Sequence, residues 1–243
     1  MDLGLTDRRF LVSGGSRGLG AAIARALARE GARVVTAART EATIVADLSE
    51  PDGPAAAVRT AVEALGGLDG VVVNSGGPPP GTFDELDDGV WAKAIQGTLM
   101  SSIRLIREAL PHLRDGLDPA ILVVLSSSVR EPIPGLVTSN VLRPGLAGLV
   151  KSLAAEIAPI RINGLAPGRF DTDRIRVIDA AQATRSGKDV ETIKAETIAR
   201  IPLGRYGDPD ELGRVAAFAL SPAASYLTGV ILAVDGGMIK SLP

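Results

Sequence analysis

The stretch Ser13-Gly14-Gly15-Ser16-Arg17-Gly18-Leu19-Gly20 decides the fold of this chain. It follows the strand-like apolar run at residues 9–12 and leads at once into an amphipathic helical pattern. Glycines at these positions permit a tight turn and a close approach of the backbone to a phosphate, while the free N–H groups that begin the helix face the anion. The stretch therefore predicts a nucleotide-binding turn rather than a merely structural one. Its candidate cofactor contacts are Gly14, Ser16, Arg17, Gly18, Leu19 and Gly20.

Outward from this turn, short β-branched runs alternate with longer stretches of helical period. The predicted strands are residues 9–12, 33–37, 43–46, 70–73, 120–125, 161–165 and 230–234. The predicted helices are residues 18–30, 54–65, 87–113, 139–158 and 208–220. Such alternation is typical of βαβ units on a parallel sheet. We therefore expect a single dinucleotide-binding α/β domain over residues 1–243, with a Rossmann-type doubly wound parallel sheet and helices on both faces.

Two segments depart from that regular alternation. Residues 38–42 are too few for a full crossover helix, so we expect the helix between the second and third strands to be missing or reduced to a turn. Residues 171–200 form a charged, mostly helical insertion after a strand. Because α/β sheets bind ligands beyond the carboxyl ends of their strands, we expect this insertion to act as a lid.

Composition excludes several classes of function. A net charge of -2 without a run of Lys or Arg argues against nucleic-acid partners. The apolar runs are too short to span a bilayer and the start lacks a signal sequence, so we expect a cytoplasmic protein without a membrane partner. The absence of cysteine excludes disulfides and thiolate chemistry. The only histidine, His112, falls near a predicted helix end, where a surface or capping role is expected and no metal site is.

Two arginines indicate which dinucleotide the turn would hold. Arg39 immediately follows the second strand, where an acidic residue would bind the ribose hydroxyls of NAD and a basic residue suits a 2′-phosphate. Arg17 in the glycine turn can add a second guanidinium to the same phosphate. The pattern favours NADP(H) over NAD(H), the alternative being that both arginines are solvated surface charges.

These residues and others downstream resemble the short-chain dehydrogenase/reductase family, and in particular its 3-oxoacyl-carrier-protein reductases, from about residue 5 to residue 238. The glycine turn resembles the family's Thr-Gly-x-x-x-Gly-x-Gly loop, and residues 201–205 and 226–237 resemble its C-terminal signature. The resemblance implies cofactor contacts at the adenine (Asp47 and Leu48), along the central strands (Asn74, Ser75 and Gly76) and at the nicotinamide amide (Pro167, Gly168 and Thr172). It also implies a homotetramer built through residues 87–113 and 139–158 and the C-terminal segment, although core packing alone would explain the apolar faces of those helices.

The catalytic positions depart from the family's pattern of Asn, Ser, Tyr and Lys. Aligning the helices on Trp91 and on residues 144–153 places Thr98 at the asparagine position, Ser139 at the tyrosine position and Arg143 at the lysine position. Only the serine is kept, as Ser126 or Ser127 at the end of the fifth strand. A serine hydroxyl is a far weaker acid than a phenol and does not reach as far. Arg143 keeps a positive charge and can bind the nicotinamide ribose, but it shuttles no proton.

Three functions are compatible with this pattern. The first is an NADP(H)-dependent oxidoreductase on a small carbonyl or alcohol, with Ser126 or Ser127, Asn140, Arg143 and a water in a rearranged proton relay. The second is a catalytically silent NADP(H)-binding module or sensor, in which the loop before Asn140 is merely solvated and Ser139 lies at a helix cap. The third is the non-redox chemistry of the related halohydrin dehalogenases, which the complete glycine turn and the missing tyrosine disfavour. A displaced proton donor would have to be Tyr206 or Tyr226, the only tyrosines.

Overall fold

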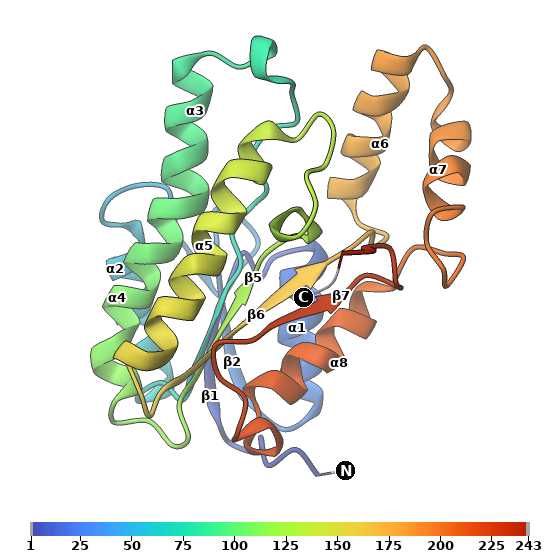
Figure 1. Cartoon of the computed structure of the whole chain (residues 1–243). Coiled ribbons are helices and arrows are strands. Elements are labelled where there is room, and N and C mark those ends of the chain that lie inside the picture. The colour runs from blue at the N-terminus through green and yellow to red at the C-terminus, as the bar shows by residue number, and fades with distance from the viewer. Residues whose placement is uncertain (1, 242–243) are drawn as a thin grey trace.

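A single parallel sheet of seven strands forms the centre of the molecule (Figure 1). The computed structural model describes residues 2–241. The strands lie in the order β3-β2-β1-β4-β5-β6-β7, so the winding reverses between β1 and β4. Their bounds are β1 Arg9–Ser13, β2 Arg33–Ala38, β3 Ile44–Val45, β4 Gly70–Val73, β5 Ala120–Val124, β6 Arg161–Pro167 and β7 Ile231–Val234. The predicted Rossmann-type doubly wound sheet is confirmed, and its reversal marks the usual ligand-binding edge.

Helices cover both faces of this sheet, as the sequence predicts. On one face lie α1 (Gly18–Arg29) and α8 (Pro209–Leu220), and on the other lie α2 (Gly53–Leu65), α4 (Ser101–Leu113) and α5 (Val137–Glu156). β5 shows why its residues form a central strand. Ile121 and Val123 point into the core beneath α2, α4 and α5, whereas Leu122 and Val124 point into the core beneath α1 and α8. A strand buried on both faces reads as a continuous apolar run.

The long helix predicted at residues 87–113 is interrupted. It consists of α3 (Asp88–Ala94), a π-helical segment (Ile95–Met100) and α4. Thr98 is buried in the π-helical segment, and the hydroxyl groups of Ser101 and Ser102 donate to the carbonyls of Gly97 and Thr98. A π-helical turn widens the helix and leaves some carbonyls without their usual partner, which these hydroxyls satisfy.

Other boundaries differ by one or two residues. α5 begins at Val137, so Ser139 lies inside the helix and not at its cap. No helix separates β2 from β3, which confirms the prediction of a missing crossover helix. Short 3₁₀ turns occur at Phe83–Glu85, Ser127–Val129 and Pro222–Ala224.

The insertion after β6 is a pair of helices that projects from the sheet (upper right in Figure 1). It consists of α6 (Asp173–Ser186) and α7 (Val190–Ile198). Thr172 and Asp189 cap these helices, since the side chain of each accepts a backbone N–H of the helix that follows. The two ends of the insertion meet in a parallel bridge between Phe170 and Gly207. The insertion is therefore a closed excursion from the sheet edge.

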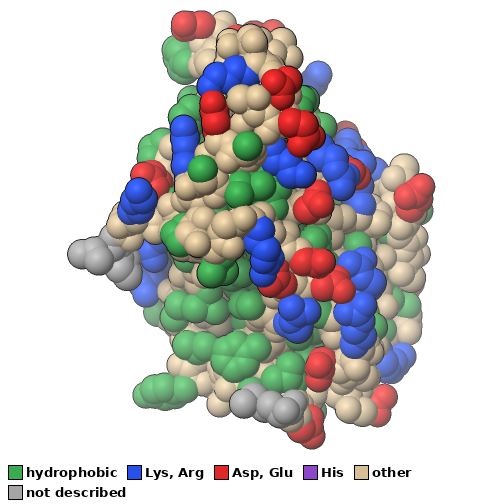
Figure 2. Space-filling view, turned by 90° about the vertical axis from the view of Figure 1, so that its right-hand side faces the viewer, with side chains coloured by type: hydrophobic (Ala, Val, Ile, Leu, Met, Phe, Trp, Pro, Cys, Tyr) green, Lys and Arg blue, Asp and Glu red, His purple; other side chains and the backbone are tan. Residues whose placement is uncertain are grey.

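The surface around α8 carries charges of both signs, and hydrophobic side chains gather lower in the same view (Figure 2). Arg25 and Arg29 of α1 both form ion pairs with Asp210 of α8. Tyr226 is fully exposed. Among residues 2–241, no helix combines the length and the apolar character that a membrane crossing requires.

Candidate functional site

The glycine turn between β1 and α1 is held in a shape that only glycine allows. Gly14 has a φ of +58°, and a Cβ atom on it would lie 2.4 Å from the carbonyl oxygen of Asn74. A Cβ atom on Gly20 would lie 2.1 Å from the carbonyl oxygen of Gly14. The Asn74 amide donates to that same Gly14 carbonyl at 3.1 Å. The turn, the start of α1 and the end of β4 therefore pack backbone against backbone. The first N–H groups of α1, which a helix leaves without partners of its own, adjoin this turn.

The two arginines that are predicted to bind the 2′-phosphate of the cofactor lie just before α1 and just after β2. Arg17 and Arg39 are exposed, and neither forms an ion pair within residues 2–241. Asp47 accepts the hydroxyl and the N–H of Ser49, at 2.6 Å and 2.9 Å. Those bonds, with a smaller contribution from Arg39, lower the pKa of Asp47. Arg17, Arg39 and Asp47 thus follow the neighbouring strands β1, β2 and β3, with Leu48 half-buried after Asp47.

The serines after β5 form a compact cluster. Ser126 accepts the N–H of Ser128 and so begins the 3₁₀ turn. The Ser128 and Ser139 hydroxyl oxygens lie 3.2 Å apart, and both residues are buried. Ser127 is also buried, whereas Ser126 is half-buried. Of the two serines that the sequence left open, Ser126 is the more accessible.

Arg143 follows Ser139 by one turn of α5 and is 5% exposed. Its guanidinium donates to the carbonyl of Val124 at 2.6 Å and to that of Ser75 at 3.4 Å, so it ties the carboxyl ends of β5 and β4 together. Burial, and to a lesser degree the charge of Arg174, lowers the pKa of Arg143 to about 10. The group therefore still carries its charge at neutral pH, without a carboxylate partner among residues 2–241.

Asn140 does not join this group. Its amide oxygen accepts the N–H of Ile133 and its amide nitrogen donates to the carbonyl of the same residue, at 3.0 Å and 2.9 Å. Both polar atoms of the side chain are thus hydrogen-bonded to the loop before α5. The expectation that Asn140 takes part in a polar relay is therefore corrected. Pro132 and Pro134 have no backbone N–H groups, so the side chain of Asn140 supplies hydrogen bonds to the loop that contains them.

Neither tyrosine lies free beside the serines. The Tyr206 hydroxyl donates to Asp179 of α6 at 2.9 Å, and Asp179 also pairs with Arg169. Burial and this carboxylate raise the pKa of Tyr206 to about 12, which makes its hydroxyl a poorer proton donor. Tyr226 is exposed at the surface.

The residues after β6 bring the base of the excursion to the glycine turn. Pro167 ends β6, and a Cβ atom on Gly168 would lie 2.7 Å from Asp235. Thr172 is buried, and a Cβ atom on Gly18 would lie 3.8 Å from its methyl group. Thr172 therefore borders the glycine turn, and its contact with the nicotinamide amide, which the resemblance implies, stays a prediction.

Sequence reasoning missed Arg174, the second residue of α6. Its guanidinium donates to the carbonyl of Pro78, and its Nε atom would lie 2.8 Å from a Cβ atom on Gly77. No local motif marks Arg174, because the contact depends on how the excursion folds back over the segment after β4.

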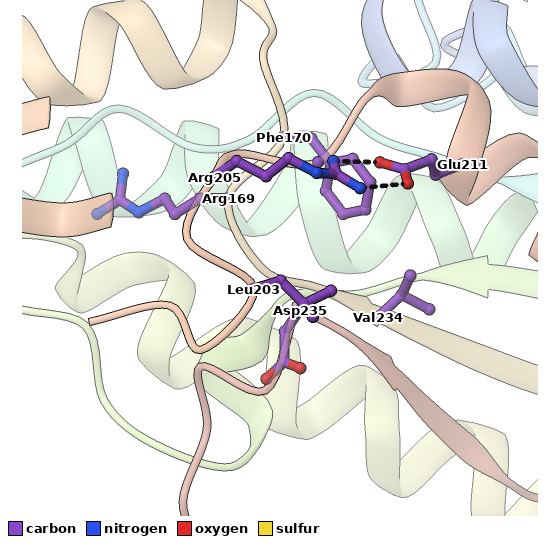
Figure 3. Close-up of a pocket in the computed structure, with 9 residues that line it drawn as sticks. Arg169, Phe170, Leu203, Arg205, Glu211, Val234 and Asp235 are labelled. Carbon is purple, nitrogen blue, oxygen red and sulfur yellow. Dashed lines mark hydrogen bonds and ion pairs between the residues drawn. The ribbon is translucent and has the colours of Figure 1, made fainter. Parts of the chain in front are cut away.

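A small hollow of about 100 Å³ lies beside the end of β7 (Figure 3). Arg205 and Glu211 form a two-fold hydrogen-bonded pair at its rim, with both bonds at 2.7 Å. The hollow is lined by Arg169, Phe170, Leu203, Arg205, Gly207, Glu211, Val234, Asp235 and Gly236. None of the predicted cofactor contacts lines it, so it is separate from the glycine turn. The groups of His, Asp and Glu in residues 2–241 include none arranged to hold a metal ion.

Comparison with known proteins places this architecture in a family. Residues 14–239 match the family model described as enoyl-(acyl carrier protein) reductase. The chain is 30% identical to the 3-oxoacyl-[acyl-carrier-protein] reductase FabG of Vibrio cholerae, over 97% of this chain and 99% of that protein. The chain belongs to the short-chain dehydrogenase/reductase family.

Two solved structures extend the similarity. The L-sorbose reductase of Gluconobacter frateurii, complexed with NADPH and L-sorbose, superposes with a TM-score of 0.90 at 28% identity and 100% coverage of both chains. A short-chain oxidoreductase of Pseudomonas aeruginosa PAO1, described as containing an atypical catalytic centre, superposes with a TM-score of 0.87 at 30% identity. That match covers 98% of this chain and 100% of the other.

Proposed function

We propose that this protein is an NADP(H)-dependent oxidoreductase that acts on a small carbonyl or alcohol substrate through a non-standard proton relay. The observation that carries the proposal is the backbone cradle of Gly14, Gly20 and Asn74, in which a Cβ atom has no room. Such a cradle at the first turn of a doubly wound sheet suits a dinucleotide diphosphate. The NADPH complex of the sorbose reductase supports the same cofactor.

The residues present fit that cofactor along its length. Ser16, Gly18 and Leu19 would face the diphosphate, and Arg17 and Arg39 the 2′-phosphate. Asp47 and Leu48 would hold the adenine. Ser75 has a buried hydroxyl oxygen without a hydrogen-bond partner in residues 2–241, next to Gly76 at the end of β4. The bound cofactor supplies hydride chemistry, and the protein supplies position and charge.

The proton relay is the unusual part of this proposal. A phenol at position 139 would act as a general acid worth about 10² to 10⁴ in rate. Ser139 instead pairs with Ser128 inside the fold. We assign Ser126 to hold the substrate oxygen, Arg143 to stabilise its negative charge through the field of a buried cation, and water to deliver the proton. The excursion formed by residues 171–200 would close over this site as a lid within a single domain, and the exposed Tyr226 surface would lie in a homotetramer interface.

A direct test measures NADPH binding and then NADPH oxidation with a panel of small aldehydes and ketones. Wild type, the double variant Ser139→Tyr/Arg143→Lys and the control Val141→Tyr, which adds a phenol on an exposed position of the same helix, are compared. We expect turnover by wild type, loss of turnover in the double variant, and unchanged turnover and NADPH affinity in Val141→Tyr. Wild-type protein that binds neither NADPH nor NADP⁺ would contradict the proposal.

A second candidate is an NADP(H)-binding module without turnover. The burial of Ser139 and the engagement of Tyr206 by Asp179 favour it, because neither hydroxyl is free to donate a proton. Tight NADPH binding with no oxidation of any panel member by wild type, and activity only in the double variant, would decide for this candidate.

A further inference from the structure

Arg174 lies across the segment that follows β4. The Nε, Cζ and Nη2 atoms would lie 2.8 to 2.9 Å from a Cβ atom on Gly77, so the plane of the guanidinium faces that glycine. One Nη2 hydrogen bond goes to the carbonyl of buried Pro78. A residue larger than glycine at position 77 would displace the group. The absence of a side chain on Gly77 thus leaves room for the guanidinium, and the carbonyl of Pro78, in a rigid run of prolines, accepts its hydrogen bond.

The charge of Arg174 is not neutralised by the protein. Other arginines at the base of the excursion have carboxylate partners, since Arg169 pairs with Asp179 and Arg176 pairs with Asp171 and Asp173. Arg174 has none among residues 2–241, and burial lowers its pKa. Arg143 stands nearby with the same lack of a carboxylate. Arg143 is buried and Arg174 is half-buried, and the two nearby cations repel each other. Such a pair is stabilised when an anion enters between or beside them.

We infer that Arg174, backed by the charge of Arg143, is a specificity-determining residue that binds a carboxylate group of the substrate. The inference rests on the proposed function and narrows it to carbonyl compounds that carry a carboxylate. Two anions share this chemistry, the substrate carboxylate and the cofactor diphosphate. The start of α1 already provides backbone N–H groups for a diphosphate. Arg174 instead contacts Gly77 and Pro78, and the carbonyl of the next residue, Pro79, accepts a hydrogen bond from Thr138 of α5.

The test compares wild type with Arg174→Met and with the matched control Arg176→Met, which removes an exposed arginine two residues further along α6. NADPH binding is titrated first. Acetate, butyrate and acetoacetate, each beside its methyl ester, are then titrated by calorimetry into the NADP⁺ complex. We expect wild type and Arg176→Met to bind at least one carboxylate about 10- to 100-fold more tightly than its ester, and Arg174→Met to show no such preference.

Every other outcome either overturns the inference or shows that the proposed function itself is wrong. No preference for any carboxylate in wild type, or a preference that survives in Arg174→Met, overturns it. An NADPH affinity that falls at least about 10-fold in Arg174→Met but not in Arg176→Met assigns the anion to the cofactor instead. If wild type binds no NADPH, the proposed function fails, and the same titrations on the free protein still decide whether Arg174 binds carboxylates.

Discussion

The buried and half-buried arginines at the two ends of the sheet differ in the partners that the protein gives them. At the amino ends of the strands, Arg8 and Arg9 surround the carboxylate of Asp69, and Arg161 donates to four backbone carbonyls at the end of α8 and the segment after it. At the carboxyl ends, Arg143 and Arg174 meet only two and one backbone carbonyls and no carboxylate of residues 2–241. An arginine that contributes to stability has its ion-pair and hydrogen-bond partners within the protein. An arginine that lacks such partners is available to bind a ligand.

The largest expected effect lies at the amino end. Asp69 accepts hydrogen bonds from the backbone and side chain of Arg9 and from the N–H of Leu117. Asp69→Asn leaves these donors facing a neutral amide, and we expect a loss of about 3–5 kcal/mol in the free energy of unfolding in urea. Asp118→Asn, which alters an exposed carboxylate near the same arginines, is the control and should change little.

The same residue predicts a pH dependence. Burial alone would raise the pKa of Asp69, but the hydrogen bonds from Arg9 and Leu117 outweigh it and lower the pKa. A lowered pKa means that the stabilisation is fully present above the unfolded value of about 4 and is lost as the pH falls through the folded value. The difference in unfolding free energy between wild type and Asp69→Asn should therefore shrink below about pH 4. A difference that stays constant down to pH 2 would show that charge is not its cause.

The next effect tests the cradle at the carboxyl end. A methyl group on Gly20 has to displace the Gly14 carbonyl, because the carbonyl oxygen lies only 2.1 Å from where the methyl carbon would stand. We expect Gly20→Ala to weaken NADPH binding by at least about 100-fold, measured by fluorescence titration. Gly148→Ala is the matched control, since a methyl group there meets nothing within 4 Å. Equal NADPH affinity in Gly20→Ala and wild type would remove the cradle from the proposed site.

A smaller effect is expected at the 2′-phosphate. Arg39→Ala should weaken NADPH binding about 10-fold and leave NADH binding unchanged, because one charge-assisted contact is lost. Arg33→Ala, at the other end of β2, serves as the control. A parallel loss for both dinucleotides would mean that Arg39 acts on structure and not on the phosphate.

The smallest expected change in stability is also the most informative for the comparison. Arg143→Met removes two hydrogen bonds but also an uncompensated buried charge, so we expect the free energy of unfolding to change by less than about 1 kcal/mol. Arg161→Met, which leaves four carbonyls without their donor, should cost about 2–3 kcal/mol. If the two variants are equally destabilised, the distinction between the two ends of the sheet fails.

The sequence predicted what depends on local pattern. The glycine turn, the strands and the missing helix before β3 follow from spacing and from the rigid needs of the backbone, and the structure places them within a residue or two. The π-helical turn at Thr98 was not predicted, since periodicity of 3.6 residues continues on both sides of it. Arg174 and the engagement of Asn140 by Ile133 were also missed. The carbonyl that a long side chain contacts depends on tertiary packing. Residue spacing along the chain therefore cannot predict it.

The closed base of the excursion has a consequence for the chain as a whole. Because Phe170 and Gly207 are held side by side, the polymer between them begins and ends at one place on the sheet edge. Lengthening such a loop costs little conformational entropy, roughly 0.6 kcal/mol for each doubling. Insertions and deletions between these two residues can therefore change the length of the α6 and α7 segment while the seven strands stay in register.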